Sequence, residues 1–259
     1  MAIITFMSDL GHRDHYVASV KARIYHANPL AQIVDLSHHI EPFNLAHAAF
    51  VLKAAYKNFP SGTTHLYVVD STGKLNEKFI AAYLEGHFFV GNDNGLLGLV
   101  SERTADEIVE LTFQEEHKTS FPEKYVLADA AAKLALDTKL TSLGPSVQEY
   151  NRKLPRQMRV TRNNISGHII HVDHYGNLVT NIEKDAFLKV RKERNFRLTF
   201  ARESVDQIYP SYHYCEEGDC IAIFNDLSLL ELAINKGNAS ELLGLHFDSP
   251  VSISFYPEI

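Results

Sequence analysis

The amino-acid sequence predicts a two-domain protein: an N-terminal α/β domain, in which helices flank a mainly parallel sheet, and a C-terminal all-β, barrel-like domain. Two observations favour this fold class. The first half alternates short β-branched runs with amphipathic segments, as is typical of a parallel sheet covered by helices. The second half is dominated by short runs in which apolar and polar residues alternate, as in antiparallel strands.

The first half predicts three strands that alternate with three helices, together with two hairpin-like strands. The first helix has apolar residues at helical spacing and is stopped by Asn28-Pro29. The second helix ends at the turn-forming run Pro60-Ser61-Gly62, after which the third strand runs into Asp70. The expected strands are 3–6, 32–36 and 65–69, the hairpin strands are 79–84 and 87–91, and the helices are 16–27, 43–56 and 125–136.

A domain boundary is expected where this pattern ends. Residues 137–162 are mostly polar and contain Gly144-Pro145 and Pro155, features typical of a linker. We place the boundary between residues 150 and 151, which gives domains of 1–150 and 151–259. In the second domain we expect strands at 168–172, 177–182, 197–200, 220–224 and 251–255, and one compact helix near 229–235.

Composition and charge exclude several classes of protein. The chain has 259 residues, of which 45% are hydrophobic and 22% charged, as in folded globular proteins. The 25 Lys and Arg against 32 Asp and Glu leave a formal net charge of −7, which argues against nucleic acid as a partner. No run approaches the roughly 18 apolar residues of a membrane helix, and the N-terminal residues do not resemble a secretory signal. We therefore expect a cytoplasmic protein without a membrane partner.

No metal centre is predicted. The chain has 14 histidines, but no His-x-x-x-His or other known ligand spacing stands out. His38 and His39 are adjacent, so their rings point to opposite faces of an extended segment. Cys215 and Cys220 lack a zinc-like setting and are expected to be reduced thiols. A metal-dependent hydrolase is the weaker alternative, and activity lost to a chelator and restored by zinc or manganese would favour it.

Three aspartates stand directly after predicted strands: Asp9, Asp70 and Asp173. Ligands of open α/β sheets bind outside the carboxyl ends of the strands, so Asp9 and Asp70 are expected to share one cleft. Taken singly, each aspartate is more simply explained as a cap for the turn that follows it. The joint pattern therefore carries more information than any one of its members.

Three further polar groups lie near predicted turns. Asp14 stands at a helix entry, where it can accept hydrogen bonds from ligand hydroxyls or act as the helix N-cap. The run 91–95 (GNDNG) predicts a loop. Residues 173–177 (DHYGN) combine a carboxylate, an aromatic face and an amide, a set that binds a base by stacking and hydrogen bonding. The same five residues are equally explained as a polar hairpin.

Six blocks of the sequence occur in an order that resembles one family. They are SDLG with DHYV (8–11, 14–17), IVDLSH (33–38), FPSGT leading to VVD (59–63, 68–70), DNGLL (93–97), YGNL with TNI (175–178, 180–182) and LELA (230–233). The family is that of the S-adenosylmethionine (SAM) hydroxide adenosyltransferases, or SAM hydrolases, which are related to the SAM-dependent fluorinase and chlorinase. The resemblance covers nearly the whole chain.

This resemblance implies a fold, an assembly and a reaction. It implies an α/β domain followed by a β-barrel domain, and a homotrimer that holds SAM at the interface between neighbouring subunits. The implied reaction is displacement by water or hydroxide at the 5′ carbon of SAM, which yields adenosine and L-methionine with SAM as substrate and no cofactor. Because the sulfonium is already a good leaving group, such a site mainly has to orient a desolvated nucleophile.

In the N-terminal half, the resemblance assigns roles to four residues. Asp9 matches the carboxylate that binds the ribose hydroxyls, and Phe43 matches an aromatic beside the sugar. Asp14 is taken as a further substrate-binding residue. Asp70 matches the acidic residue near the attacking water and is the expected catalytic residue.

In the C-terminal half, the resemblance assigns substrate-binding roles to five residues. Tyr175 and Tyr212 match the aromatic positions that sandwich adenine, and Asp173 and Asn177 match those that face the methionine amine and the nucleoside. Asn225 matches a position at the methionine end of the pocket. The alternative is that these are ordinary barrel aromatics and turn residues.

The chain departs from the family pattern at three positions. Glu77 stands where the hydrolases have an arginine, with Lys74 and Lys78 close by in sequence. Pro122 replaces a histidine before the alanine-rich helix, and proline can neither orient nor deprotonate water. Asp226 replaces a serine and adds a carboxylate near that of the substrate.

Two functions therefore compete. The first is a SAM hydrolase in which Asp70 and a lysine or histidine from a nearby loop position the water. The second is a catalytically impaired protein that binds SAM or adenosine on the same scaffold. We favour the enzyme, because enzymes that lack single water-positioning groups often keep part of their rate acceleration.

Overall fold

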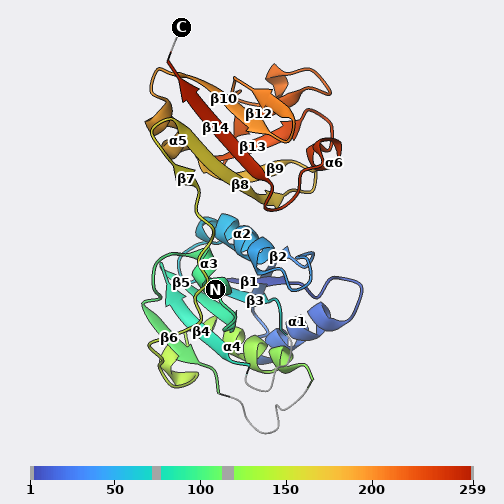
Figure 1. The fold of residues 1–259 in the computed structure, drawn as a ribbon. Helices are drawn as coiled ribbons and strands as arrows, with labels where there is room; N and C mark the ends of the chain where they lie inside the picture. The colour runs from blue at the N-terminus through green and yellow to red at the C-terminus, as the bar shows by residue number, and fades with distance from the viewer. Residues whose placement is uncertain (1–2, 72–76, 113–119, 258–259) are drawn as a thin grey trace. The chain divides into compact units, whose positions relative to one another are not determined.

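Residues 3–71, 77–112 and 120–257 are described in the computed structural model of the chain (Figure 1). Lys74, one of the two lysines near the missing arginine, lies outside these ranges. The chain divides into two units, Met1–Pro155 and Arg156–Ile259. The division falls inside the proline-containing segment 137–162, and each unit is described by itself.

In the described part of the first unit, six strands form one sheet in the order β2-β1-β3-β5-β4-β6. Strands β1, β2, β3 and β5 are parallel, whereas β4 is antiparallel to both of its neighbours. The predictions of a mainly parallel sheet and of a β4–β5 hairpin are therefore confirmed. The strands are β1 Ile3–Ser8, β2 Gln32–Ser37, β3 Thr64–Val68, β4 Phe79–Leu84, β5 His87–Asn92 and β6 Glu107–Glu110.

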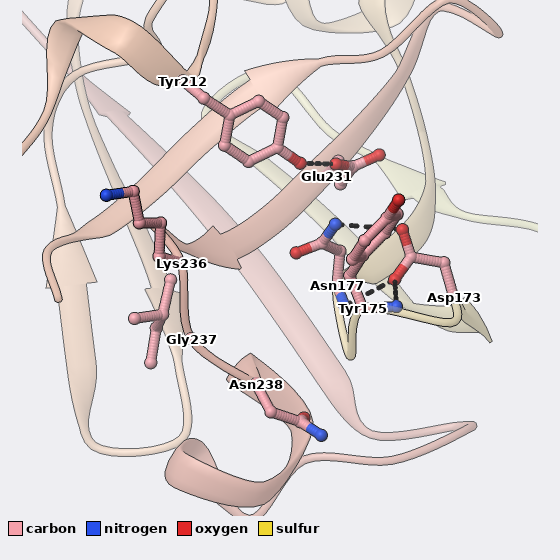
Figure 2. A pocket seen from close by; sticks show the side chains of 9 residues that line it. Asp173, Tyr175, Asn177, Tyr212, Glu231, Lys236, Gly237 and Asn238 are labelled. Atoms are coloured by element: carbon pink, nitrogen blue, oxygen red, sulfur yellow. Dashed lines mark hydrogen bonds between the residues drawn. The ribbon is translucent and has the colours of Figure 1, made fainter. Parts of the chain in front are cut away.

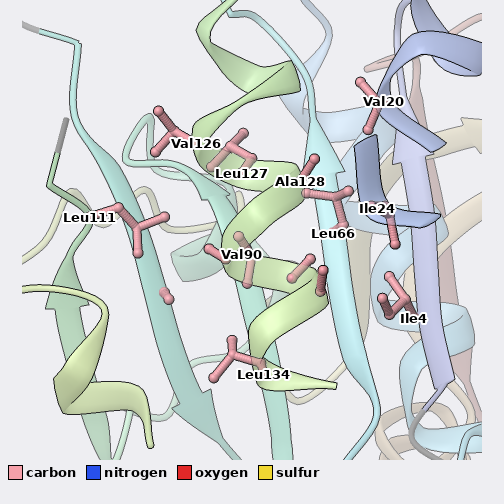
Figure 3. Close-up of a cluster of buried hydrophobic side chains, with 14 of the residues drawn as sticks. Ile4, Val20, Ile24, Leu66, Val90, Leu111, Val126, Leu127, Ala128 and Leu134 are labelled. Atoms are coloured by element: carbon pink, nitrogen blue, oxygen red, sulfur yellow. The ribbon is translucent and has the colours of Figure 1, made fainter. Parts of the chain in front are cut away.

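Helices cover both faces of this sheet. On one face α1 (Tyr16–Ala27) and α4 (Val126–Leu134) enclose a core that includes Ile4 and Leu66 (Figure 3). On the other face α2 (Leu45–Ala55) and the short α3 (Leu96–Val100) pack on side chains such as Met7. Successive side chains of a strand point to opposite faces, so a sheet covered on both sides needs nearly continuous apolar strands.

The helix α2 begins two residues later than the sequence predicts. Phe43 has a φ of 65°, in the left-handed region, and lies before the helix. The side chain of Asn44 caps the helix by accepting a hydrogen bond from the backbone N–H of His47. After α2 the chain continues as a 3-10 turn, η1 Tyr56–Asn58. The prediction for α1 is confirmed at both ends.

The described strands of the second unit form an antiparallel, barrel-like sheet. Their order is β11-β10-β14-β8-β9-β13-β12, with β7 also paired to β8. Tyr209, beyond β11, bridges Ile223 of β12 and so brings the two edges of the sheet toward each other. The strands are β7 Arg159–Val160, β8 Asn164–Val172, β9 Leu178–Glu183, β10 Asn195–Phe200, β11 Glu203–Val205, β12 Cys220–Phe224, β13 Leu229–Ile234 and β14 Pro250–Tyr256.

The prediction of a helix near 229–235 is wrong, because this segment forms strand β13. Its apolar residues fit helical spacing as well as alternation, and such short runs are ambiguous from periodicity alone. The β12–β13 pairing decides the outcome, since it joins Cys220 to Ile234 and Phe224 to Leu230. The helices of this unit are instead α5 (Lys184–Arg191) and α6 (Ala239–Leu243), which the sequence analysis did not predict. In the described ranges, no helix has the length and apolar character needed to cross a bilayer.

Two histidines lie buried against each other in the first unit. The ring nitrogens His65 Nε2 and His87 Nδ1 are 3.2 Å apart, and Thr5 Oγ1 lies 2.7 Å from His65 Nδ1. Burial, followed by the neighbouring His87, lowers the pKa of His65 to about 3, and burial also lowers the pKa of His87. Both rings are therefore neutral at neutral pH, and the folded protein resists their protonation.

This pair makes the fold sensitive to acid. The pKa of His65 is lower in the folded than in the unfolded chain. The contribution of neutral His65 to the free energy of unfolding is therefore fully present above about pH 6.5 and is lost as the pH falls toward 3. We expect urea unfolding to show a free energy of unfolding that is about 2 kcal/mol lower at pH 5 than at pH 7.5 from His65 alone.

The variant His65→Gln should lose this part of the pH dependence. The matched control is His26→Gln, at an exposed position of α1, which should keep it. Equal pH dependence in the parent and in His65→Gln would contradict the assignment.

Candidate functional site

Asp9 ties together the loops at the carboxyl ends of β1, β2 and β3. Its Oδ2 accepts hydrogen bonds from the backbone N–H groups of Phe43 and Asp70, each at 3.0 Å. Its own N–H donates to the carbonyl oxygen of Val68 at 3.2 Å. Within the described residues Oδ1 accepts no hydrogen bond. The structure thus brings Asp9 and Asp70 together and leaves one Asp9 oxygen for a ligand.

The two residues bonded to Asp9 both have unusual backbones. Asp70 has a φ of 52° and Phe43 a φ of 65°, in the left-handed region that non-glycine residues seldom adopt. Such conformations persist when the surroundings hold them, and they cluster at functional sites. The side chain of Phe43 is 65% exposed, so the turn presents this ring to ligands or partners.

A polar network occupies the neighbouring strand ends. Asn92, at the end of β5, donates from Nδ2 to Glu77 Oε1 at 2.6 Å and to Ser71 Oγ at 3.0 Å. Asn94 donates to the carbonyl oxygen of Val69 at 2.8 Å. Glu77, which replaces the family arginine, is therefore held by Asn92 and by Ser71, the residue after Asp70.

Lys78 does not supply the missing cation. Its Nζ lies 2.7 Å from Glu110 Oε2, in an exposed ion pair between β6 and the residue before β4. A lysine held by a carboxylate at the solvent-exposed edge of the sheet is poorly placed to orient water beside Asp70. Lys78, the one of the two lysines that the structure describes, therefore pairs with Glu110 and not with a group of the candidate site.

The histidine position is occupied by Pro122, the first residue of the 3-10 turn η3 (Pro122–Lys124). The next residue, Glu123, is only 4% exposed. Burial, reinforced by the charges of Glu77 and Asp9, raises the pKa of Glu123 to about 7. The sequence analysis missed Glu123, because a single glutamate beside a proline carries no signal of burial.

His38 is a buried member of the loop after β2. Its Nδ1 lies 2.7 Å from Ser8 Oγ, and its Nε2 lies 3.1 Å from Asp35 Oδ1. Burial lowers the pKa of His38, although Asp35 acts in the opposite direction. Ser8 is fully buried and out of reach of substrate. We interpret this chain of contacts as a support for the strand end that carries Asp9.

Two other candidate residues of the first unit are exposed. Asp14 lies in a bend before α1, and the N-cap of that helix is His15, which makes no side-chain capping bond. The explanation of Asp14 as a helix cap is therefore wrong. The ring of His12 lies 4.9 Å from that of His38, at the same group of loops.

In the second unit, a cavity of about 620 Å³ collects four of the five predicted residues of that half (Figure 2). Figure 2 shows Tyr212 and Tyr175 at this cavity, on different segments of the chain. Asn225 does not line the cavity but contacts one of the residues that do. The lining residues are Asp173, Tyr175, Asn177, Tyr212, Glu231, Ile234, Lys236, Gly237 and Asn238.

The β8–β9 hairpin brings three of these residues together. Asp173 Oδ1 accepts hydrogen bonds from the N–H groups of Tyr175 and Asn177, and Oδ2 accepts one from Asn177 Nδ2, all at 2.9 Å. Gly176 has a φ of 83°, and a Cβ there would lie 2.0 Å from Asn238 Oδ1, so the turn requires glycine. The polar hairpin and the pocket are thus the same structure, and the hairpin presents Tyr175, which is 74% exposed.

A buried carboxylate forms one wall of the cavity. Glu231 of β13 is 7% exposed and accepts hydrogen bonds from the Tyr212 hydroxyl and, at 3.1 Å, from Asn225 Nδ2. Burial and then this bond to Glu231 raise the pKa of Tyr212 above its ordinary value, so Tyr212 stays a neutral donor. The sequence analysis did not name Glu231 as a site residue, although a lone charge in an apolar strand was a signal.

Asn225 mainly stabilises the local β12–β13 turn. Its Oδ1 accepts hydrogen bonds from the N–H groups of Leu227 and Leu229, both at 3.1 Å, and so shapes the β12–β13 turn. Only its Nδ2 reaches toward the cavity, through Glu231. Among the described residues, no three His, Cys, Asp or Glu side chains are grouped as ligands for a metal ion.

Known proteins resemble the chain, several of them over nearly its whole length. The (R)-S-adenosyl-L-methionine hydrolase of Thermus thermophilus is 32% identical over 98% of this chain and 100% of its own length. The protein of the same name from Methanocaldococcus jannaschii is 28% identical, over 98% and 96%. A fluorinase from Actinopolyspora mzabensis is 25% identical over 71% of this chain and 72% of its own length. A crystal structure of an uncharacterized conserved protein from Thermotoga maritima superposes with a TM-score of 0.88 at 31% identity, over 97% and 99%.

Two family models match the two halves of the chain. Residues 4–144 match the SAM hydroxide adenosyltransferase N-terminal domain, and residues 167–252 match the C-terminal domain. The first match ends before the division at Pro155, and the second begins after it. The chain therefore belongs to the SAM hydroxide adenosyltransferase family.

Proposed function

We propose that this protein hydrolyses SAM at the 5′ carbon and releases adenosine and L-methionine. The observation that carries the proposal is Asp9, whose carboxylate holds Asp70 and Phe43 at the carboxyl ends of the strands. These are the residues that the family resemblance assigns to the ribose and to the attacking water. The relatives named (R)-S-adenosyl-L-methionine hydrolase support the same reaction.

The charge of the second-unit cavity supports a cationic ligand. The two described partners of Glu231, Tyr212 and Asn225, are neutral donors, so neither brings a positive charge to the carboxylate. Lys236 lines the same cavity, but its Nζ pairs with Glu217 at 2.8 Å. A buried carboxylate without a cation favours a ligand that brings one. SAM carries both a sulfonium and an ammonium group.

The reaction requires little bond chemistry from the protein. The water oxygen forms a bond to the 5′ carbon, the carbon–sulfur bond breaks, and its electron pair stays on the sulfur of methionine. The water gives up one proton in the process, and no cofactor is needed. Asp70 orients the water in line with the carbon–sulfur bond, while Tyr175 and Tyr212 offer faces on which adenine stacks.

We propose the family assembly for this chain as well: a homotrimer that holds SAM at a subunit interface. The exposed rings of Phe43 and Tyr175 support it, because large apolar side chains on a surface often mark an interface or a ligand site. We also propose a cytoplasmic location, supported by the two free cysteines.

The proposed trimer predicts that light scattering of the purified protein gives three times the 29.2 kDa chain mass. A monomer that hydrolyses SAM would contradict the assembly but not the reaction.

A second function, SAM or adenosine binding without turnover, is favoured by one set of observations. Glu77 and Pro122 stand at the arginine and histidine positions, and Lys78 is paired with Glu110. The binding residues Asp9, Asp173 and Asn177 are all present in this chain. A measurement of turnover separates the two functions.

Replacement of Asp70 should abolish most of the turnover. Asp70→Asn keeps the backbone bond to Asp9 and removes the charge beside the water, so we expect kcat to fall about 100-fold or more. The measurement is chromatography of adenosine and methionine after incubation with SAM. Asp185→Asn, at an exposed position of α5, is the matched control. A parent that binds SAM calorimetrically but releases no adenosine would overturn the hydrolase in favour of the binding protein.

Replacement of Glu231 should weaken the binding of charged SAM more than the binding of neutral adenosine. Glu231→Gln keeps the size of the side chain and removes its charge, so calorimetry should show SAM binding weakened about tenfold or more. Binding of neutral adenosine should change much less. Glu203→Gln on exposed β11 is the control in the same unit. Equal losses for SAM and adenosine would show that Glu231 only supports the fold of the cavity.

A further inference from the structure

Two asparagines at the carboxyl end of β5 donate their side-chain amides to the segment that carries Asp70. The Nδ2 of Asn94 donates to the carbonyl oxygen of Val69 at 2.8 Å. The Nδ2 of Asn92 donates to the hydroxyl oxygen of Ser71 at 3.0 Å. Val69 and Ser71 are the residues directly before and after Asp70. The end of β5 therefore holds the chain on both sides of the carboxylate proposed to orient the water.

Both asparagines are themselves fixed by the sheet and by the helix that follows. The strands β3 and β5 are parallel neighbours, so their carboxyl ends lie side by side. A Cβ at Gly91 would lie 2.1 Å from the ring of Tyr67, and the Tyr67 hydroxyl donates to the carbonyl oxygen of Asn92 at 3.4 Å. The Oδ1 of Asn94 accepts the N–H of Leu96, the first residue of α3, at 3.2 Å. Each donor thus stands on a rigid support.

Glu77 decides the orientation of the Asn92 amide. Asn92 is 1% exposed, and its Nδ2 donates to Glu77 Oε1 at 2.6 Å as well as to Ser71. An ionised carboxylate accepts hydrogen bonds and donates none, so a flipped amide would place two acceptors against each other. The Oδ1 of Asn92 is buried without a partner among the described residues, which leaves the contacts of Nδ2 to fix the amide. Glu77 therefore keeps the donor of Asn92 directed at Ser71.

The position of the Asp70 carboxylate depends on its backbone. Within the described ranges, its side chain makes no hydrogen bond or ion pair, and only its N–H is bonded, to Asp9. The φ of Asp70 is 52°, a conformation that persists when the surroundings hold it. A change in the backbone on either side would therefore move the carboxylate directly.

We propose that Asn92 and Asn94 are positioning residues for SAM hydrolysis, which hold Asp70 in the conformation that orients the attacking water. The inference rests on the proposed function. Neither amide touches the substrate, because each acts through a residue that flanks Asp70. Glu77, at the position of the family arginine, then serves to orient Asn92. This departure from the family pattern is part of the support for Asp70.

Replacement of Asn94 tests the proposal. Asn94→Ser keeps an oxygen that can accept the N–H of Leu96 and removes the donor to Val69. We expect kcat to fall about tenfold or more, since small errors in orientation slow a reaction that depends on alignment. The KM for SAM should be nearly unchanged. Asn58→Ser is the matched control, because the exposed Asn58 donates in the same way to a backbone carbonyl oxygen, at 3.2 Å.

A double-mutant cycle with Asp70→Asn separates positioning from general support of the fold. If Asn94 acts through the Asp70 carboxylate, Asn94→Ser should lower kcat far less in the Asp70→Asn background than in the parent. Equal losses of kcat in the two backgrounds would overturn the positioning role while the hydrolase proposal stands. A parent that releases no adenosine would overturn both.

An exchange of roles between Asn92 and Glu77 covers the case in which Asn94→Ser does not fold. Asn92→Asp alone places two carboxylates against each other and should lower kcat. Adding Glu77→Gln restores a donor and an acceptor with the same net charge as in the parent, so most of kcat should return. Full activity of Asn92→Asp, or no recovery in a double variant whose circular dichroism shows it to be folded, would overturn the proposal.

Discussion

The candidate site depends on one carboxylate oxygen, Asp9 Oδ2, which accepts two backbone N–H groups from different loops. These bonds hold Phe43 and Asp70 in left-handed conformations that neither residue would keep alone. Asp9 is itself fixed by its position at the end of buried β1, by its bond to Val68 and by the His38–Ser8 contact behind it. A sheet buried on both faces therefore places the groups proposed to bind ribose and water.

The second unit uses the same device at a hairpin. Both carboxylate oxygens of Asp173 accept hydrogen bonds within the turn that presents Tyr175. The amide oxygen of Asn225 likewise accepts hydrogen bonds within the β12–β13 turn. What remains available in the cavity is the aromatic surface and the charge of Glu231. Residues that the family pattern marks as ligand-binding thus include some whose observed contacts mainly build the loop.

The sequence predicted most of the fold because its strong signals are local. Asn28-Pro29 ends α1 where expected, and the alternating runs mark most strands of the second unit. The segment 229–235 failed because LLELAI fits both helix and strand periods, and only pairing with β12 decides between them. In the site, motif order indicated Asp9 and Asp70, but Glu231 acquires its properties from burial and from neighbours distant in sequence, which no local pattern encodes.

The central claim is that water attacks the 5′ carbon of SAM in this protein. Its most direct test is turnover of SAM in ¹⁸O-enriched water, followed by mass spectrometry of the products. The account predicts adenosine that carries one ¹⁸O atom in its 5′-hydroxyl group, together with unlabelled methionine. Unlabelled adenosine, label in the methionine fragment, or no adenosine at all would contradict it.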